Sequence, residues 1–127
     1  MRLLLDTHAL LWYAAGDPRL SGQALDAINA TDAKSVVSAA SLWEMAIKVS
    51  IGKLALGETV REFWSRHENA GVDLLPINAL ESTFVEKMPF HHRDPFDRLI
   101  IAQAIVHQLP IVSKDVIFDL YGISRIW

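Results

Sequence analysis

Short apolar segments alternate with longer helical patterns along the chain, and this alternation most constrains the fold. Strands are predicted at residues 1–5, 34–38, 72–77 and 109–113, with a fifth in the closing segment YGISRIW. Helical patterns lie between successive strands, an order that favours right-handed crossovers joining parallel strands. The sequence therefore predicts an α/β fold, with a mainly parallel sheet of four to five strands between helices.

The predicted helices are bounded by residues that cap or break helices. Gly16, Gly71 and Pro89 are expected to end three of them. The predicted helices span residues 7–15, 22–30, 39–52, 58–70, 79–88 and 95–108. No repeat, linker or change of composition divides the 127 residues, a length close to the commonest domain size. We expect a single domain that spans residues 1–127.

Composition narrows the class of protein. Cysteine is absent, so neither disulfides nor a thiolate metal site can form. The segment MRLLLDTHALLWYAAGD is too short and too polar for a signal peptide or a membrane span, and we expect a soluble, cytoplasmic protein without a membrane partner. The net charge of −3 argues against a general nucleic-acid-binding surface, unless several acids surround a cation.

Four acids lie near the ends of predicted strands, where parallel α/β sheets form their sites. Asp6 ends the first strand, and Glu44 lies in the helix after the second. Asp97 begins the helix before the fourth strand, and Asp115 follows that strand. Apolar sequence surrounds or flanks all four. The remaining acids considered lie on polar helix faces or in turns, where a solvated carboxylate is expected: Asp26, Asp32, Glu58, Glu62, Glu68, Glu81 and Glu86.

Each of the four also has an explanation in helix chemistry. Asp6 and Asp115 would cap the segments that follow them, and Glu44 would join Ser41 in a capping box or pair with Lys48. The fourth acid would face the free amides of its own helix. Four independent caps, however, have no reason to converge on one edge. Carboxylates gathered there would repel one another unless a cation held them ionised.

The types of ligand indicate which metal such a site would hold. Carboxylates are hard oxygen donors that suit Mg²⁺ or Mn²⁺ rather than zinc. The adjacent His91 and His92 cannot place two imidazoles as a helical pair does, so a zinc site is not predicted there. A carboxylate-bound Mg²⁺ suits the hydrolysis of phosphate esters. No Ser-His-Asp arrangement and no glycine-rich phosphate loop competes with this interpretation.

Four blocks of sequence, in this order, resemble the PIN-domain ribonucleases, particularly the VapC toxins of bacterial toxin–antitoxin pairs. The blocks are LLLDTHALLW, VVSAASLWEMAIKVSIGKL, HHRDPFDRLIIAQA and IVSKDVIFDLYGISRIW, and they span nearly the whole chain. The resemblance implies a three-layer α/β/α fold and RNA cleavage that depends on Mg²⁺ or Mn²⁺. It also implies in-line attack of a metal-activated water on the RNA phosphorus, a cognate antitoxin as partner, and a homodimer.

The resemblance also assigns roles to individual acids. Asp6, Glu44 and Asp97 match the core acids of the family, and they would hold one metal ion. Asp115 matches a fourth and more variable acidic position, where it would help to hold that ion or a second one. The resemblance therefore implies that these four residues form the catalytic and metal-binding set.

Supporting roles follow from the same blocks. Thr7 and Ser113 match positions that often carry Ser or Thr beside the acids, and Asp94 belongs to the DPFDR signature. We expect Asp94 to cap the helix that follows and to orient its loop or Arg98, while Asp97 turns to the metal. Candidates for contacts with RNA phosphates are the nearby cations, Lys48, Arg93, Arg98 and Lys114.

Two other functions remain open at this stage. A non-catalytic interaction module would keep the same fold, but it would have lost one or more of the four acids, which are all present here. A receiver domain that accepts a phosphoryl group needs an Asp at the end of its third strand. The segment VDLLPIN offers none there, although Ser113 and Lys114 fit the receiver pattern superficially.

The aromatic residues have a structural and a functional interpretation. Trp12, Trp43 and Trp64 fall on predicted helices with apolar neighbours, so core packing is the expectation for each. Alternatively, Trp12, Tyr13 and Met45 would form an exposed patch for self-association or for the helix of an inhibitor.

Overall fold

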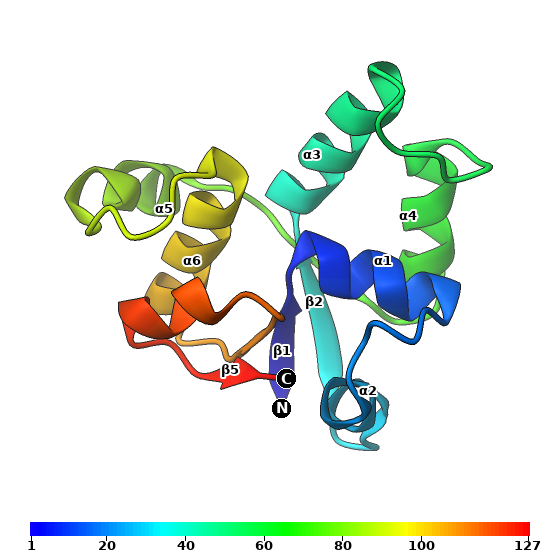
Figure 1. Cartoon of the computed structure of the whole chain (residues 1–127), viewed down its shortest axis with the longest axis horizontal. Coiled ribbons are helices and arrows are strands. Elements are labelled where there is room, and N and C mark those ends of the chain that lie inside the picture. The colour runs from blue at the N-terminus through cyan, green and yellow to red at the C-terminus, as the bar shows by residue number, and fades with distance from the viewer.

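The computed structural model describes residues 1–127, in which six α-helices and two 3-10 helices (η1 and η2) accompany five strands. Figure 1 shows their arrangement. In chain order the elements are β1 (Arg2–Leu5), α1 (Thr7–Ala15), α2 (Gly22–Asn29), β2 (Lys34–Ser38), α3 (Ala39–Ser50), α4 (Val60–Asn69), β3 (Asp73–Leu75), α5 (Ala79–Phe84), η1 (Val85–Lys87), α6 (Pro95–His107), β4 (Ile111–Val112), η2 (Val116–Tyr121) and β5 (Arg125–Ile126).

The five strands form one sheet in the order β3-β2-β1-β4-β5, and every neighbouring pair is parallel. The central strand β1 sets the register, because Leu4 lies opposite Val36 on one side and Ile111 on the other. The predicted parallel sheet is confirmed, and the closing segment does form its fifth strand.

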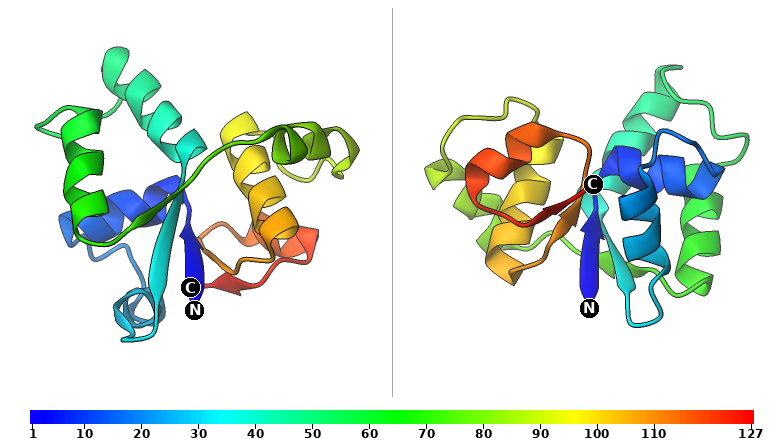
Figure 2. Two further views of the ribbon diagram at one scale, coloured as in Figure 1. Left: turned by 180° about the vertical axis from the view of Figure 1, so that it is seen from behind. Right: turned by 60° about the horizontal axis from the view of Figure 1, so that its bottom comes forward.

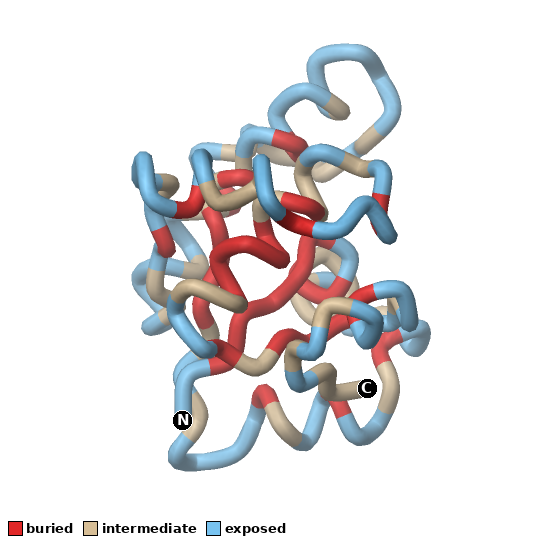
Figure 3. The backbone as a smooth tube through the Cα atoms, turned by 90° about the vertical axis from the view of Figure 1, so that its left-hand side faces the viewer, coloured by how far each residue is buried: buried red, intermediate tan, exposed pale blue.

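Alternating side chains of the central strands supply two separate cores, one on each face of the sheet. Leu4 and Ile111 pack against α6 and η2, whereas Leu3, Leu5 and Val112 pack against α1, α2 and α4. Helices therefore cover both faces, and Figure 3 shows the buried chain running through the middle of the molecule. The predicted three-layer α/β/α architecture is confirmed.

Several element bounds differ from the prediction. The helix predicted at residues 79–88 ends at Phe84 and continues as η1. Helix α4 begins at Val60, because Thr59 accepts from the Glu62 amide in a capping box. Strand β4 has only two ladder residues, and Asp115 caps the helix η2 directly after it. None of the helices is long and apolar enough to cross a lipid bilayer.

One acid assigned to the solvated group is instead buried. Glu81 lies on α5 and faces α6, and it is only 1% exposed. Its carboxylate accepts a hydrogen bond from the Asn78 amide (3.1 Å) and lies 2.7 Å from His107 Nε2. The expectation of a solvated carboxylate is wrong, because α5 packs along α6 and turns this side chain inward.

The sheet order determines where a ligand can approach. Strands β2 and β3 lie on one side of β1, whereas β4 and β5 lie on the other, so the order reverses between β1 and β4. Open α/β sheets bind ligands beyond the carboxyl ends of the strands at such a reversal. Figure 2 (left) shows α3 extending from this end of the sheet, whereas α6 begins near this end and runs back alongside the strands.

Candidate active site

Asp6 lies at the reversal point, directly after β1. It is 6% exposed, and its Oδ1 accepts a hydrogen bond from the Ala9 amide (2.8 Å), so it caps α1 as expected. Burial raises the pKa of Asp6, although hydrogen bonds from Ser113 and Ala9 oppose that rise. The charge of Asp115 raises this pKa further. The capping of α1 by Asp6 does not by itself explain why the charge of Asp115 acts on this carboxylate.

Glu44 reaches the same place from the first turns of α3. The Thr7 hydroxyl donates to Glu44 Oε1 (2.7 Å) and lies 2.9 Å from Ser41 Oγ. Lys48 Nζ donates to Glu44 Oε2 at 2.8 Å, as the spacing along the helix predicts. The capping box with Ser41 is absent, because Ser38 caps α3. Thr7 thus ties α1 to α3 beside Asp6.

Asp97 enters the cluster from the first turn of α6. Asp94 caps this helix by accepting from the Phe96 (2.8 Å) and Asp97 (3.1 Å) amides, so the predicted capping role is confirmed. The side chain of Asp97 is therefore not needed as the cap. Burial raises the pKa of Asp97 to about 7, and the charge of Asp94 adds to that rise.

The charges of Asp6 and Glu44 also raise the pKa of Asp97, whereas His92 lowers it. Side chains that follow β1 or lie on α3 and α6, far apart in the sequence, therefore interact with one another. Figure 1 shows the start of α3 and the start of α6 near the carboxyl end of β1. This convergence is the arrangement that the sequence pattern predicts for a cation site.

Asp115 closes the cluster from the segment after β4. Its Oδ2 lies 2.8 Å from His92 Nε2, which is also 3.3 Å from Asp97 Oδ2. One ligand atom from each of these three residues lies within 4.8 Å of the others. Ser113 is fully buried beneath, and its hydroxyl accepts from the Asp115 amide (3.0 Å).

Two residues of this site were not predicted. Ser41 is buried beside Thr7, and His92, 9% exposed, bridges two of the four acids. In the sequence, His92 stands out only as half of a candidate zinc-binding pair with His91. The position of His92 in the sequence was the one signal for its role. It lies two residues before Asp94, the cap of α6, and such a residue is close to the first turn of that helix.

The four cations predicted to contact RNA lie in different environments. Lys48 pairs with Glu44, and Arg93 and Lys114 are exposed near the cluster in sequence. Arg98 is only 7% exposed, and its guanidinium donates to three backbone carbonyls. The predicted RNA contact of Arg98 does not fit this placement, because the side chain is buried and three of its hydrogen bonds go to carbonyls inside the protein.

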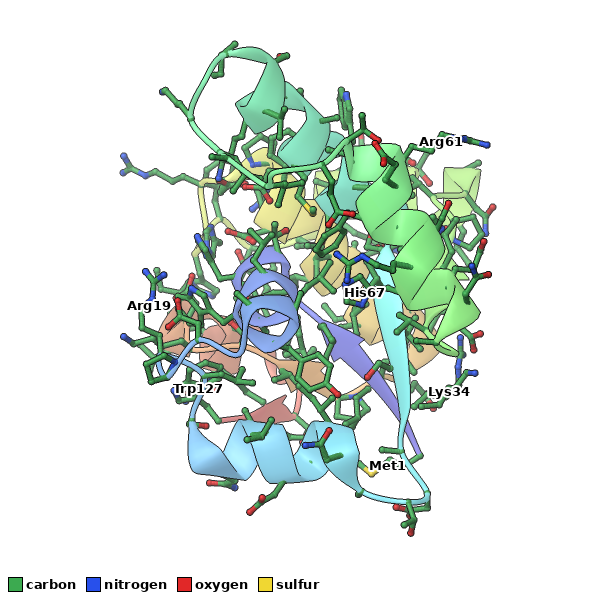
Figure 4. All side chains as sticks on the ribbon, turned by 90° about the vertical axis from the view of Figure 1, so that its right-hand side faces the viewer. Met1, Arg19, Lys34, Arg61, His67 and Trp127 are labelled. Atoms are coloured by element: carbon green, nitrogen blue, oxygen red, sulfur yellow. The ribbon has the colours of Figure 1, made fainter.

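Three other cations lie apart from one another. Figure 4 places Arg19, Lys34 and Arg61 on different parts of the surface. Arg19 forms an ion pair with Asp17 at 2.7 Å, and Lys34 lies 3.7 Å from Asp73.

The predictions for the aromatic residues are partly wrong. Trp12 and Trp64 pack against the core beside α1 and α4, as expected. Trp43 is 60% exposed, because the inward face of α3 is occupied by Glu44 and Met45. Met45 is fully buried, so the exposed patch of Trp12, Tyr13 and Met45 does not exist.

The donor set fits a hard divalent cation. Asp6, Glu44, Asp97 and Asp115 offer carboxylate oxygens, and each such oxygen has two lone-pair sites, so a hydrogen bond and a metal contact are compatible. Oxygen donors of this kind suit Mg²⁺ or Mn²⁺. A cation would also offset the repulsion that raises the pKa of Asp97.

Comparison with known proteins identifies the family and the fold. The PIN domain family matches residues 3–123. Ribonuclease VapC22 of Mycobacterium tuberculosis is 33% identical over 114 residues, which cover 89% of this chain and 86% of that protein.

Solved structures share the fold at lower sequence identity. VapBC2 from Rickettsia felis, bound to a DNA fragment from its promoter, has a TM-score of 0.70 with 15% identity over the whole of both chains. VapBC-1 from nontypeable Haemophilus influenzae has a TM-score of 0.69 with 16% identity, covering 98% of this chain and 96% of that one. Because the family match extends over nearly the whole sequence, this chain belongs to the PIN-domain family.

Proposed function

We propose that this chain is a Mg²⁺- or Mn²⁺-dependent endoribonuclease and the toxin of a toxin–antitoxin pair. One observation carries the proposal: carboxylates after β1, on α3, on α6 and after β4 lie close together. Burial raises the pKa of Asp97 to about 7, and the charges of Asp6 and Glu44 add to that rise. The similarity to Ribonuclease VapC22 supports RNA as the substrate. The predicted cytoplasmic location stays a prediction.

The residues of the cluster would divide the work as follows. Asp6, Glu44 and Asp97 would hold the cation, and Asp115 would assist from the opposite side. A bound divalent cation would lower the pKa of water and neutralise charge on the phosphate. Thr7 orients Glu44, and the Ala9 amide orients Asp6, so the oxygens are preorganised before the cation or the RNA arrives.

Asp97→Asn tests this assignment directly. Asn keeps the shape of the side chain and removes its charge, and Asp94 still caps α6. We expect RNA cleavage to fall by at least about 100-fold, because several kcal/mol of transition-state stabilisation depend on the cation. The measurement is single-turnover cleavage of a mixed-sequence RNA, with circular dichroism as the check on folding. Unchanged cleavage by a folded variant would contradict the assignment.

Chelation tests the metal requirement. We expect EDTA to abolish cleavage, and Mg²⁺ or Mn²⁺ in excess to restore it. Cleavage that persists in EDTA would exclude a divalent-metal mechanism. Glu62→Gln is a suitable control variant for Asp97→Asn, since Glu62 is an exposed carboxylate whose partner is Thr59 in the capping box of α4.

The contacts with RNA are proposed for the cations that remain available. Lys48 lies at the cluster, and Arg93 and Lys114 are exposed beside the segments that carry Asp97 and Asp115. Neutralising Arg93 or Lys114 should weaken RNA binding and reduce its dependence on salt. We do not extend this proposal to Arg98, which is buried.

An antitoxin protein is proposed as the partner, since the solved structures with this fold include a toxin–antitoxin complex. A cleft of about 440 Å³ adjoins the cluster, and His8, Trp12, Lys48, Leu54 and Phe63 are among its lining residues. Its lining combines apolar side chains with lysines and with two arginine–carboxylate ion pairs, and this mixture fits a peptide segment better than a small polar molecule. The antitoxin should suppress cleavage when bound; equal cleavage rates with and without it would contradict this role.

A homodimer is proposed on the evidence of an exposed apolar stripe at α3. Trp43 and Ile47 on this helix and Ile51 at its C-cap follow one another by four residues, and they are 60%, 36% and 59% exposed, although the Trp43 ring also packs edge-on against Phe96. A monomer rarely leaves such a stripe in water. Light scattering should give twice the 14.2 kDa mass of one chain. A single-chain mass at micromolar concentration would refute the dimer.

The two alternative functions are weaker. A receiver domain has the strand order 2-1-3-4-5, whereas this sheet has the order β3-β2-β1-β4-β5, so the receiver interpretation is wrong. A non-catalytic module of the same fold has no need of four carboxylates gathered in one place. The raised pKa values of Asp6 and Asp97 make the gathering costly to the stability of the protein at neutral pH.

A further inference from the structure

We propose that His92 is a positioning residue of the acidic cluster, which holds Asp115 against Asp97 through a hydrogen bond from its Nε2. This inference rests on the proposed function, because its consequence is a change in metal affinity at the same site. His92 belongs to neither of the elements that carry these two acids. It lies in the loop before α6, and its ring bridges the helix and the segment after β4.

The hydrogen-bond pattern fixes the tautomer of the ring. The Asp94 amide donates to His92 Nδ1 at 3.2 Å, so Nδ1 must keep a free lone pair. The ring hydrogen is therefore on Nε2, which points at Asp115 Oδ2 (2.8 Å) and lies 3.3 Å from Asp97 Oδ2. A protonated Nε2 is a donor to carboxylates and not a metal ligand. His92 thus acts on the acids rather than on the cation.

The backbone around His92 is held on both sides. Its amide donates to the Tyr121 hydroxyl (2.8 Å), and its carbonyl accepts from Arg98 Nη1 (3.2 Å). Its ring lies against Phe118, with 5.6 Å between ring centroids. The ring therefore cannot swing away without breaking contacts to η2 and α6.

Arg98 extends this support to the rest of the loop. Its guanidinium donates to the carbonyls of Pro89 and Val85 and stacks over the Phe90 ring at 4.2 Å. Tyr121 also donates to the Pro89 carbonyl at 2.9 Å. The hydrogen bonds of the buried Arg98 thus hold the loop that carries His92.

Without the His92 donor, Asp115 would lose the contact that faces the cluster. Its other oxygen, Oδ1, accepts from the Ile117 amide (3.0 Å) as the cap of η2, and this bond alone does not direct Oδ2 toward Asp97. Asp115 is also the most exposed of the three side chains in this group, at 34%. The spacing between Asp97 and Asp115 therefore depends on His92.

Variants of His92 separate the two ring nitrogens. Asn places its amide nitrogen near the position of Nδ1, whereas Gln reaches the position of Nε2 and keeps a donor there. We expect His92→Asn to weaken Mn²⁺ binding by about 10- to 100-fold, the usual effect of losing a partner of a metal-binding side chain. His92→Gln should retain most of the affinity. His91→Asn is the matched control, because His91 is the exposed neighbour.

The affinity is measured on the full chain without RNA, by titration of Mn²⁺ followed by electron paramagnetic resonance. Equal Mn²⁺ affinities of His92→Asn and wild type would overturn the proposal. So would a strong nitrogen coupling to bound Mn²⁺ in the wild type, which would make His92 a ligand. If the wild type binds no Mn²⁺, the proposed function fails instead.

The ring tautomer gives an independent test that needs no variant. In the metal-free wild type, ¹⁵N NMR of the imidazole should show the hydrogen of His92 on Nε2 and slow exchange of that hydrogen with water. A hydrogen on Nδ1 would overturn the proposal whatever the metal affinities are. This measurement also decides the question if His92→Asn fails to fold.

Discussion

The two ends of α6 each bring a carboxylate close to a histidine, and the two carboxylates behave in opposite ways. At the first turn, the pKa of Asp97 is raised to about 7. Near the last turn, the hydrogen bond from His107 lowers the pKa of Glu81, although this residue is only 1% exposed. Burial alone therefore does not identify a functional acid.

The difference lies in the neighbours of each carboxylate. Glu81 has one histidine and the Asn78 amide as partners, and these compensate its burial. Asp97 shares one histidine with Asp115 and faces the charges of Asp94, Asp6 and Glu44 as well. In a structural ion pair the opposite charges balance. An excess of negative charge at an edge that a ligand can reach is instead typical of a cation site.

The largest expected difference between the two ends is the response to metal. Mg²⁺ at 100 times its dissociation constant should stabilise the wild type by about 2.7 kcal/mol. Asp97→Asn should lose most of this gain, whereas Glu81→Gln should keep it. The measurement is thermal unfolding with increasing Mg²⁺, using wild type in EDTA as the reference. If Mg²⁺ stabilised the Asp97 variant fully, the metal site would lie elsewhere.

Removing the carboxylate at the other end should affect stability alone. Glu81→Ala leaves His107 and the Asn78 amide without their partner, so we expect a loss of about 1–3 kcal/mol. RNA cleavage by the folded fraction should be unchanged. Urea unfolding and cleavage are measured on the same sample. A stability equal to wild type would show that the buried pair contributes nothing net, as some buried pairs do.

The pH dependence of stability should have opposite signs at the two ends. Asp97 has a raised pKa in the folded metal-free protein, so its stabilising contribution is present below about pH 3.8 and declines as pH rises toward 7. Glu81 has a lowered pKa, so its contribution is present above pH 4.5 and declines as pH falls through the lowered value. The slope per group is at most about 1.4 kcal/mol per pH unit.

Urea unfolding in EDTA at pH 4 to 8 tests these signs. The stability of wild type relative to Asp97→Asn should decrease as pH rises. Its stability relative to Glu81→Gln should increase with pH over the acidic part of this range. Parallel curves for wild type and Asp97→Asn would contradict a raised pKa of Asp97 in the folded protein.

Local signals in the sequence were sufficient for much of the fold. Alternating strand and helix patterns predict the parallel sheet, and Asp94 before Pro95 predicts the start of α6. These features depend on backbone geometry and on periodicity, which operate over a few residues. The weakest bounds were those of β3 and β4, because strands of three and two residues carry little periodicity.

The acids of the site were also visible in the sequence, but their contacts were not. Asp6 and Asp115 follow strands, whereas Glu44 and Asp97 lie on helices that connect strands. The rule for parallel sheets places sites beyond the carboxyl ends of the strands, where such residues can meet. The bridge made by His92, the burial of Arg98 and the inward turn of Glu81 all depend on which helices pack together. The spacing of residues within one segment does not predict which residues of another segment they will contact.

The sequence by itself determined the strand and helix order and the acids that reach the edge of the sheet, because local backbone preferences and hydrophobic periodicity act along the chain. Only the tertiary structure decided which polar side chains compensate one another. At one end of α6 it gives Glu81 as many partners as it needs, and at the other it leaves Asp97 with more negative charge than its neighbours offset. That balance is a sum over residues distant in sequence, so it exists only once the chain has folded.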